Sequence, residues 1–174
     1  MGWQVSITVL QCRWRLESST LYKWYSLHAQ DIMKKVLVID DNPTIVELIK
    51  YAVNLQSTYE VVVAYDGEQG LESVYTENPD CIIIDVKMPR MDGYKLVRCL
   101  RGDARTANIP MIILSAMTRE EDQMTGLLSG VDEYLTKPFK PRALNAAIER
   151  VLCLTPAERQ RRMDYLLQVH AERE

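Results

Sequence analysis

The stretch that decides the fold is residues 35–53, KVLVIDDNPTIVELIKYAV. Its first part, residues 36–39, is an uninterrupted run of branched apolar side chains, which predicts a strand buried on both faces. Asn42 and Pro43 then supply an N-cap and a proline at the first position of a helix. Apolar side chains follow at helical spacing, namely Ile45, Leu48, Ile49, Ala52 and Val53. The domain therefore begins with one strand followed by one amphipathic helix.

The same unit recurs along the chain. Apolar runs predict four further strands, at residues 61–63, 81–84, 111–114 and 134–136. Amphipathic segments predict helices after residues 66–67, near 94–101, near 119–128 and over 144–152, with Gly130 as a C-terminal cap of the third. Uniformly apolar strands that alternate with such helices predict an α/β fold, in which helices cover both faces of a parallel sheet.

Two segments lie outside this pattern. Residues 1–32 hold all three tryptophans but show no sustained period, and their apolar run at 5–10 is too short and interrupted for a signal peptide. A start codon assigned upstream of the true one, a genuine, poorly ordered extension and a functional docking segment all stay open. Residues 155–158, TPAE, predict a capping box and a short, mostly solvated helix. We expect an extension at 1–32, a domain at 33–153 and a helical tail at 154–174.

Composition excludes several classes of protein. The 174 residues are 47% hydrophobic and 26% charged, which is typical of a globular chain and not of disorder. The net charge of −3 gives no reason to expect a nucleic-acid binder. The cysteines, at positions 12, 81, 99 and 153, form no CxxC pair, so we expect buried, reduced thiols and a cytoplasmic protein. Purely apolar runs reach five residues, far from the 20 or so of a membrane span, so no membrane insertion is expected.

Polar side chains follow four of the predicted strands. Asp40 and Asp41 follow the first, Asp85 the third, Ser115 the fourth and Lys137 the fifth. Each alone has an ordinary explanation, because acids stand in loops, serines cap helices and lysines cover surfaces. In an open parallel sheet, however, ligands bind at the carboxyl ends of the strands. The predicted fold brings all five residues to one cleft.

Three neighbouring carboxylates need a compensating charge. At 4 Å and an effective dielectric near 20, two of them repel by about 4 kcal/mol. Either one takes up a proton or a cation neutralises them. Oxygen ligands without cysteine or histidine favour a hard ion such as Mg²⁺. Mg²⁺, an ammonium and a hydroxyl around one carboxylate suit a phosphoryl group, so the cleft predicts Mg²⁺-dependent phosphoryl chemistry on an aspartate.

Four motifs within residues 34–153 resemble, in order and spacing, the receiver domain of bacterial two-component response regulators. They are VIDDN at 38–42, DVKMPRMDG at 85–93, LSA at 114–116 and KPF at 137–139. The resemblance implies a flavodoxin-like (βα)5 three-layer sandwich with a parallel sheet in the order 2-1-3-4-5. It also implies a cis peptide bond between Lys137 and Pro138.

The resemblance implies a metal site and an acceptor. Asp85 looks like the phosphoacceptor. Asp41, Asp85 and the backbone carbonyl of Lys87 look like direct Mg²⁺ ligands, and Asp40 would act through water. Lys87 departs from the family, which more often has methionine or a smaller polar residue there. Its side chain could shield the phosphoryl group or crowd attacking water, so it bears on the phosphoryl lifetime.

The resemblance also implies a switch. Lys137 would pair with one phosphoryl oxygen, and Ser115 would hydrogen-bond another. Tyr134 matches the aromatic residue that turns inward when the hydroxyl residue moves. The signal would leave through the surface made by the helix at 119–128, the fifth strand and the last helix, where a partner or a second copy would bind.

Three other classes of protein share some of these features. Haloacid-dehalogenase-like phosphohydrolases use similar residues, but their acceptor ends the first strand in a DxD pattern that is missing here. A receiver-like scaffold that is never phosphorylated usually lacks one of the five residues, and all five are present. A DNA-binding regulator needs more than one short tail helix.

We therefore expect a single-domain response regulator of the chemotaxis-regulator kind. A sensor histidine kinase or phosphotransfer protein would phosphorylate it on Asp85, in a transfer partly catalysed by the receiver itself. It would act as a signalling protein, not an enzyme, through an output partner and without contacting nucleic acid.

Overall fold

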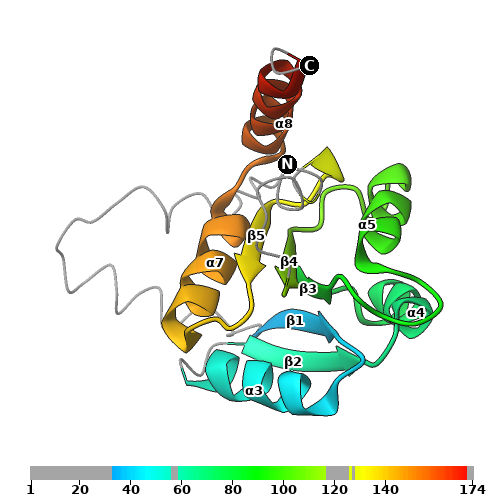
Figure 1. Cartoon of the computed structure of the whole chain (residues 1–174), viewed down its shortest axis with the longest axis vertical. Coiled ribbons are helices and arrows are strands. Elements are labelled where there is room, and N and C mark those ends of the chain that lie inside the picture. Colours follow the sequence, from blue (N-terminus) through cyan, green and yellow to red (C-terminus); the bar gives the residue numbers. More distant parts are fainter. Residues whose placement is uncertain (1–32, 56–58, 117–125, 127, 172–174) are drawn as a thin grey trace, which may run out of the picture. The chain divides into compact units, whose positions relative to one another are not determined.

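A computed structural model describes residues 33–55, 59–116, 126 and 128–171. The chain divides into two units, Met1–Met33 and Lys34–Glu174, and every described element belongs to the second. The predicted extension at 1–32 and most of the predicted helix at 119–128 lie outside the described residues. The elements are β1 (Lys34–Ile39), α3 (Pro43–Asn54), β2 (Tyr59–Ala64), α4 (Gly67–Glu77), β3 (Cys81–Asp85), α5 (Gly93–Gly102), β4 (Met111–Ser115), β5 (Glu133–Thr136), α7 (Pro141–Cys153) and α8 (Pro156–Ala171) (Figure 1).

The five strands form one parallel sheet in the order β2-β1-β3-β4-β5. Helices α3 and α7 pack on one face of the sheet, and α4 and α5 pack on the other. Figure 1 shows α7 and α5 on opposite sides of the strands. The predicted flavodoxin-like sandwich and its strand order are confirmed. Because all strands are parallel, their carboxyl ends meet at one edge.

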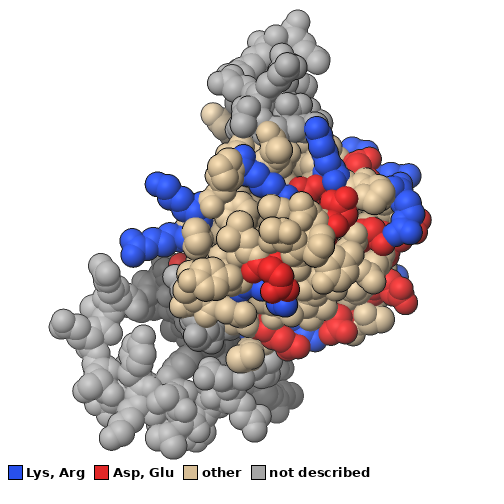
Figure 2. Space-filling view, turned by 60° about the horizontal axis from the view of Figure 1, so that its bottom comes forward, with Lys and Arg blue, Asp and Glu red and all other residues tan. Residues whose placement is uncertain are grey.

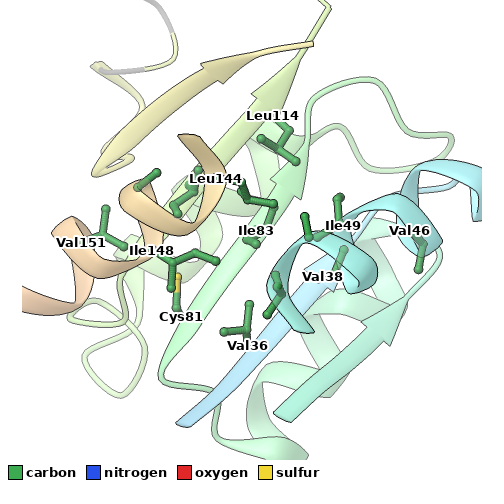
Figure 3. Packing of buried hydrophobic residues seen from close by; sticks show 14 residues of the cluster. Val36, Val38, Val46, Ile49, Cys81, Ile83, Leu114, Leu144, Ile148 and Val151 are labelled. Atoms are coloured by element: carbon green, nitrogen blue, oxygen red, sulfur yellow. The ribbon is translucent and has the colours of Figure 1, made fainter. Parts of the chain in front are cut away.

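Two apolar layers hold the sheet between its helices. Val36 and Val38 of β1 face α3 and α7, while Leu37 and Ile39 face α4 and α5. Figure 3 shows the first layer, in which side chains of α3 and α7 point toward β1 and β3. The predicted burial on both faces holds for the inner strands β1, β3 and β4, whereas the edge strands β2 and β5 are partly exposed.

The start of α3 follows the prediction, but one of its apolar residues does not. The Asn42 side chain accepts a hydrogen bond from the Thr44 backbone N–H, and Pro43 is the first helical residue, so the predicted N-cap is confirmed. Leu48 was expected in the core, yet it is 44% exposed, and Val46 is buried instead. At 100° per residue, Val46, Ile49 and Val53 share one face, and Leu48 lies outside it.

The tail forms α8, with the predicted capping box. The Thr155 hydroxyl accepts from the Glu158 backbone N–H at 3.2 Å, and the Glu158 carboxylate accepts from the Thr155 backbone N–H at 2.9 Å. The helix is mostly exposed, as expected. One side chain departs from that prediction, because Arg159 is largely buried and ion-paired with Asp132.

The prediction of buried, reduced cysteines holds only in part. Cys81 is reduced and buried, Cys99 is reduced but exposed, and Cys153 is exposed. Burial raises the pKa of the Cys81 thiol, so it stays protonated. Cys12 lies outside the described residues.

The surface shows no dominant charge on the face drawn in Figure 2. There, the basic and acidic side chains of the described residues are interspersed. Of the helices in the described part, none has both the length and the apolar composition that a membrane span needs.

Candidate functional site

The predicted site residues lie at the carboxyl edge of the sheet. Asp40 directly follows β1, Asp85 is the last residue of β3, Ser115 is the last of β4 and Lys137 directly follows β5. The register pairs Asp85 with Leu114 and Ser115 with the residue before Lys137. The backbone N–H of Lys137 donates to the Ser115 carbonyl at 2.7 Å, and the peptide bond after Lys137 is cis, as the resemblance implies.

The centre of the site is one ammonium shared by two carboxylates. Lys137 Nζ lies 2.6 Å from Asp40 Oδ2 and 2.6 Å from Asp85 Oδ1. These side chains are only 17%, 2% and 9% exposed, respectively. Charge-assisted hydrogen bonds of this length in a largely buried place are strong and fix all three groups. The structure therefore brings together the side chains of three of the five predicted residues by direct contact.

The two acids after β1 differ in what they can still bind. Asp40 uses both carboxylate oxygens, because Oδ1 accepts from the Asn42 backbone N–H at 2.9 Å and Oδ2 accepts from Lys137. Asp41 is exposed. Asp41 is therefore accessible to a metal ion at this edge, whereas both carboxylate oxygens of Asp40 already accept hydrogen bonds from the protein.

The site disfavours a full set of negative charges. Burial raises the pKa of Asp85, Lys137 lowers it by hydrogen bonding and charge, and Asp40 raises it further, with a net upward shift. Burial lowers the pKa of Lys137, but its hydrogen bonds to Asp40 and Asp85 outweigh burial, so the net shift is upward. The lysine therefore stays charged, and Asp85 needs more positive charge nearby to ionise as easily as a free carboxyl group.

A divalent cation fits this charge balance. Three carboxylates and one ammonium sum to −2, the charge that one Mg²⁺ neutralises. Across the described ranges, no three His, Cys, Asp or Glu side chains converge as a metal cage. Mg²⁺ usually binds to one or two carboxylates and keeps several waters, so a set of two carboxylates and a backbone carbonyl suits it. The donors present therefore fit Mg²⁺ better than a metal that demands a full protein cage.

A glycine that sequence reasoning passed over holds the acceptor strand in place. A Cβ on Gly93 would lie much closer to the carbonyl oxygen of Asp85 than 3.0 Å, the shortest contact that Cβ atoms make in proteins. Gly93 also donates its N–H to the Val86 carbonyl at 3.0 Å, and Asp92 caps α5 by accepting from the Lys95 N–H. The start of α5 therefore packs directly on the backbone of Asp85. The Asp92-Gly93 pair was the available signal.

The predicted switch residues lie on adjacent strands. Ser115 is 1% exposed at the end of β4. Tyr134 on β5 is half-buried, pairs in register with Ile113, and packs against the apolar layer under α4 and α5. A Cβ on Gly126 would lie only 2.6 Å from the Tyr134 ring, so this glycine makes room for the tyrosine. The sequence analysis assigned no role to Gly126. The only indication of one is that it is a single glycine inside an expected helix.

An ion pair at the rim of the site also escaped prediction. Arg90, in the loop after β3, contacts the carboxylates of Asp66 and Glu68 at the start of α4. Arg90 has φ near 67°, an uncommon backbone conformation for a side chain of its size. The contact joins the loops after β2 and β3, and no spacing rule in the sequence indicates it.

Comparison with known proteins supports the expected family. Residues 36–149 match the response regulator receiver domain. The alkaline phosphatase synthesis transcriptional regulatory protein PhoP of Bacillus subtilis is 42% identical over 120 residues, covering 68% of this chain and 48% of PhoP. The DNA-binding dual master transcriptional regulator RpaA of Synechocystis is 38% identical, covering 69% of this chain and 49% of RpaA. The chain thus spans about half the length of the curated relatives it matches.

Solved structures agree with the sequence comparison. The chemotaxis protein CheY4 of Vibrio cholerae aligns with a TM-score of 0.64 and 33% identity, over 68% of this chain and 98% of CheY4. The receiver domain of the Francisella response regulator 1452 aligns with a TM-score of 0.63 and 39% identity, over 68% and 96%. The chain therefore belongs to the response regulator receiver domain family, whose general function is phosphorylation-dependent signalling.

Proposed function

We propose that this chain is a phosphorylation switch whose phosphoacceptor is Asp85. One observation carries the proposal: the Lys137 ammonium lies 2.6 Å from both Asp85 and Asp40 at the carboxyl edge of the sheet. An oxygen of the Asp85 carboxylate attacks the phosphorus of a phosphohistidine on a sensor histidine kinase. The P–N bond breaks, the imidazole leaves with a proton, and an aspartyl phosphate remains.

The neighbouring groups position and neutralise the transferred group. The Lys137 ammonium neutralises the negative charge on one phosphoryl oxygen, and the Ser115 hydroxyl donates a hydrogen bond to another. Mg²⁺ would be held by Asp41, Asp85 and the Lys87 carbonyl, with Asp40 acting through water because its oxygens are already engaged. When bound, Mg²⁺ supplies charge neutralisation.

The reverse reaction would be hydrolysis of the aspartyl phosphate, helped by the same groups. The Lys87 side chain is exposed, two residues after Asp85. From there it can reach over the phosphoryl group and slow the approach of water. We propose that the receiver catalyses both steps in part and remains a signalling protein.

The Mg²⁺ ligand Asp41 offers a test. We expect phosphorylation by a small phosphodonor to require Mg²⁺, to stop on chelation, and to fall at least about tenfold in Asp41→Ala, because an already sparse ligand set loses a carboxylate. Intact-mass measurement at several Mg²⁺ concentrations reports it. Glu47→Ala is the control, since Glu47 is exposed on α3 and, within the described residues, forms an ion pair only with Lys50. Equal Mg²⁺ dependence in both variants would contradict the assignment.

The output would run through Ser115 and Tyr134. Moving Ser115 toward the phosphoryl group opens space that the Tyr134 ring can fill, which changes the surface of β5 and α7. The size of this population shift is limited by the differential interaction of the phosphoryl group with the two states.

We expect Ser115→Ala to bind beryllofluoride, a phosphoryl mimic, and yet to show weak NMR shift changes on β5 and α7. Removal of the hydroxyl takes away the donor that would move, but leaves Asp85 and Lys137 intact. The measurement compares both proteins with and without beryllofluoride and Mg²⁺. Equal shift changes on that surface would show that Ser115 is not the coupling residue.

The partners and boundaries complete the proposal. We propose residues 33–153 as the signalling unit, a cytoplasmic location, and a sensor histidine kinase or phosphotransfer protein as phosphodonor. The signal would leave through an output protein or a second copy on the surface of β5 and α7. Several relatives are named as transcriptional regulators, and the chain matches about half of their length. That this chain does not contact nucleic acid stays a prediction.

A further inference from the structure

A buried carboxylate lies at the end of β5 opposite to the candidate site. Asp132 directly precedes β5, and its side chain is fully buried. One oxygen accepts from the Met111 N–H and from Arg101 Nη2, each at 2.8 Å, and the other accepts from Arg159 Nε. Two guanidinium groups compensate a charge that would otherwise be costly to bury. We call Asp132, Arg101 and Arg159 the arginine clamp.

The two arginines of the clamp have different surroundings. Arg101 belongs to α5 and also donates to three carbonyls of neighbouring loops, those of Ala107, Ile109 and Gly130. Arg159 belongs to α8 and, within the described part of the chain, donates otherwise only to the Asn108 carbonyl, at 3.2 Å. Loss of Arg159 therefore leaves Asp132 paired with Arg101, whereas loss of Arg101 would disrupt the loops.

The clamp is a polar anchor of α8. Beside it, a pocket remains between Val131 on one side and Met163 and Leu166 of α8 on the other. The apolar packing of α8 on the domain is therefore incomplete. Arg159 is 13% exposed, while Arg161 on the same helix is exposed. Arg159 therefore links the 16-residue helix α8 to Asp132 before β5 and to the Asn108 carbonyl.

Strand β5 connects the clamp to the candidate site. It has four residues, with Asp132 immediately before it and Lys137 immediately after it. At about 3.3 Å per residue, the two residues are roughly 16 Å apart along the strand. Tyr134, the proposed switch residue, lies between them. A displacement of this short edge strand therefore moves both Asp132 and Lys137.

We propose that α8 is a second output element, whose docking through the arginine clamp weakens when Asp85 carries a phosphoryl group. The inference rests on the proposed function. In the structure, the ion pair between Arg101 and Asp132 is formed while Lys137 contacts the Asp85 carboxylate. A phosphoryl oxygen lies farther from the β3 backbone than that carboxylate, and we infer that Lys137 follows it and that β5 shifts with Lys137. Because Asp132 contacts Arg159 of α8 directly, a shift of Asp132 relative to α8 weakens that contact.

Amide hydrogen exchange in the full chain tests the anchor first. We expect Arg159→Ala to raise the exchange rate of α8 amides at least about fivefold, and Arg161→Ala to leave it unchanged. Both substitutions remove an arginine from the same helix, and only one touches Asp132. If α8 stays equally protected in Arg159→Ala, the clamp does not anchor it and the inference is overturned.

Beryllofluoride with Mg²⁺ then tests the coupling. In the unaltered chain we expect the α8 amides to exchange at least about fivefold faster on beryllofluoride binding, with no further rise in Arg159→Ala. By reciprocity, Arg159→Ala should bind beryllofluoride more tightly. A response of the β5 amides without one in α8 would overturn this inference and leave the proposed function standing. No response in either element would overturn both.

Discussion

The Asp85→Asn protein should take up no phosphoryl group from a small phosphodonor with Mg²⁺, whereas the unaltered chain acquires one. Asparagine keeps the shape of the side chain but lacks the anionic oxygen that attacks phosphorus, and it is a poorer Mg²⁺ ligand. Lys137 keeps Asp40 as its partner, so the ammonium stays paired. Intact-mass measurement detects the group, and sensitivity to hydroxylamine identifies it as an acyl phosphate.

A matched control separates the acceptor from acidic residues in general. Asp164→Asn makes the same chemical change on exposed α8, where Asp164 accepts a hydrogen bond from Gln160 of the same helix. It should be labelled like the unaltered chain. Undiminished labelling of Asp85→Asn would contradict the proposal.

Loss of labelling in Asp85→Asn should not come from unfolding. Burial raises the pKa of Asp85, which means that its negative charge is disfavoured in the folded site. An uncharged amide therefore removes repulsion from Asp40. We expect the thermal midpoint of the variant to equal or exceed that of the unaltered chain, as measured by circular dichroism.

The sequence predicted the fold well because local and long-range signals agree. The run at 36–39 is apolar on both faces, and only an inner strand of a parallel sheet buries both faces. Leu48 was misplaced because Leu48 and Val46 are both apolar but point to nearly opposite sides of the helix, so only one of them can face the sheet, and periodicity alone does not decide which. The edge strands β2 and β5 are partly exposed because each pairs with only one neighbouring strand. No local sequence pattern shows which strands lie at the edge of the sheet.

The candidate site was predictable to a smaller degree. Strand ends and motif spacing predicted which residues gather, and the contact of Lys137 with Asp40 and Asp85 agrees with that. The pairing of Asp132 with Arg159 was not predictable, because it joins residues 27 apart through side chains with ordinary surface chemistry. Such a contact depends on where a helix docks, and no sequence period encodes docking.

A methyl group on Gly93 should damage both the fold and the phosphorylation site. In Gly93→Ala the new Cβ would collide with the Asp85 carbonyl oxygen and would lie 3.0 Å from Ile84 Cγ2 and from Val86 Cα. The first contact is with backbone, which no rotamer change relieves. Either α5 moves away or the end of β3 shifts, and each displaces Asp85 from Lys137. Overpacking of this kind costs about 1–3 kcal/mol, and we expect the upper end.

The other end of α5 provides the control. A Cβ on Gly102 meets nothing within 4 Å, so Gly102→Ala adds the same methyl group without a collision. Alanine is favoured over glycine in a helix by up to about 1 kcal/mol, so this variant should be as stable as the unaltered chain or slightly more stable. Urea unfolding of both variants, with phosphorylation measured in parallel, should show a loss of stability and of labelling for Gly93→Ala alone. If the two variants behave alike, the close approach of α5 to the Asp85 backbone does not position the acceptor.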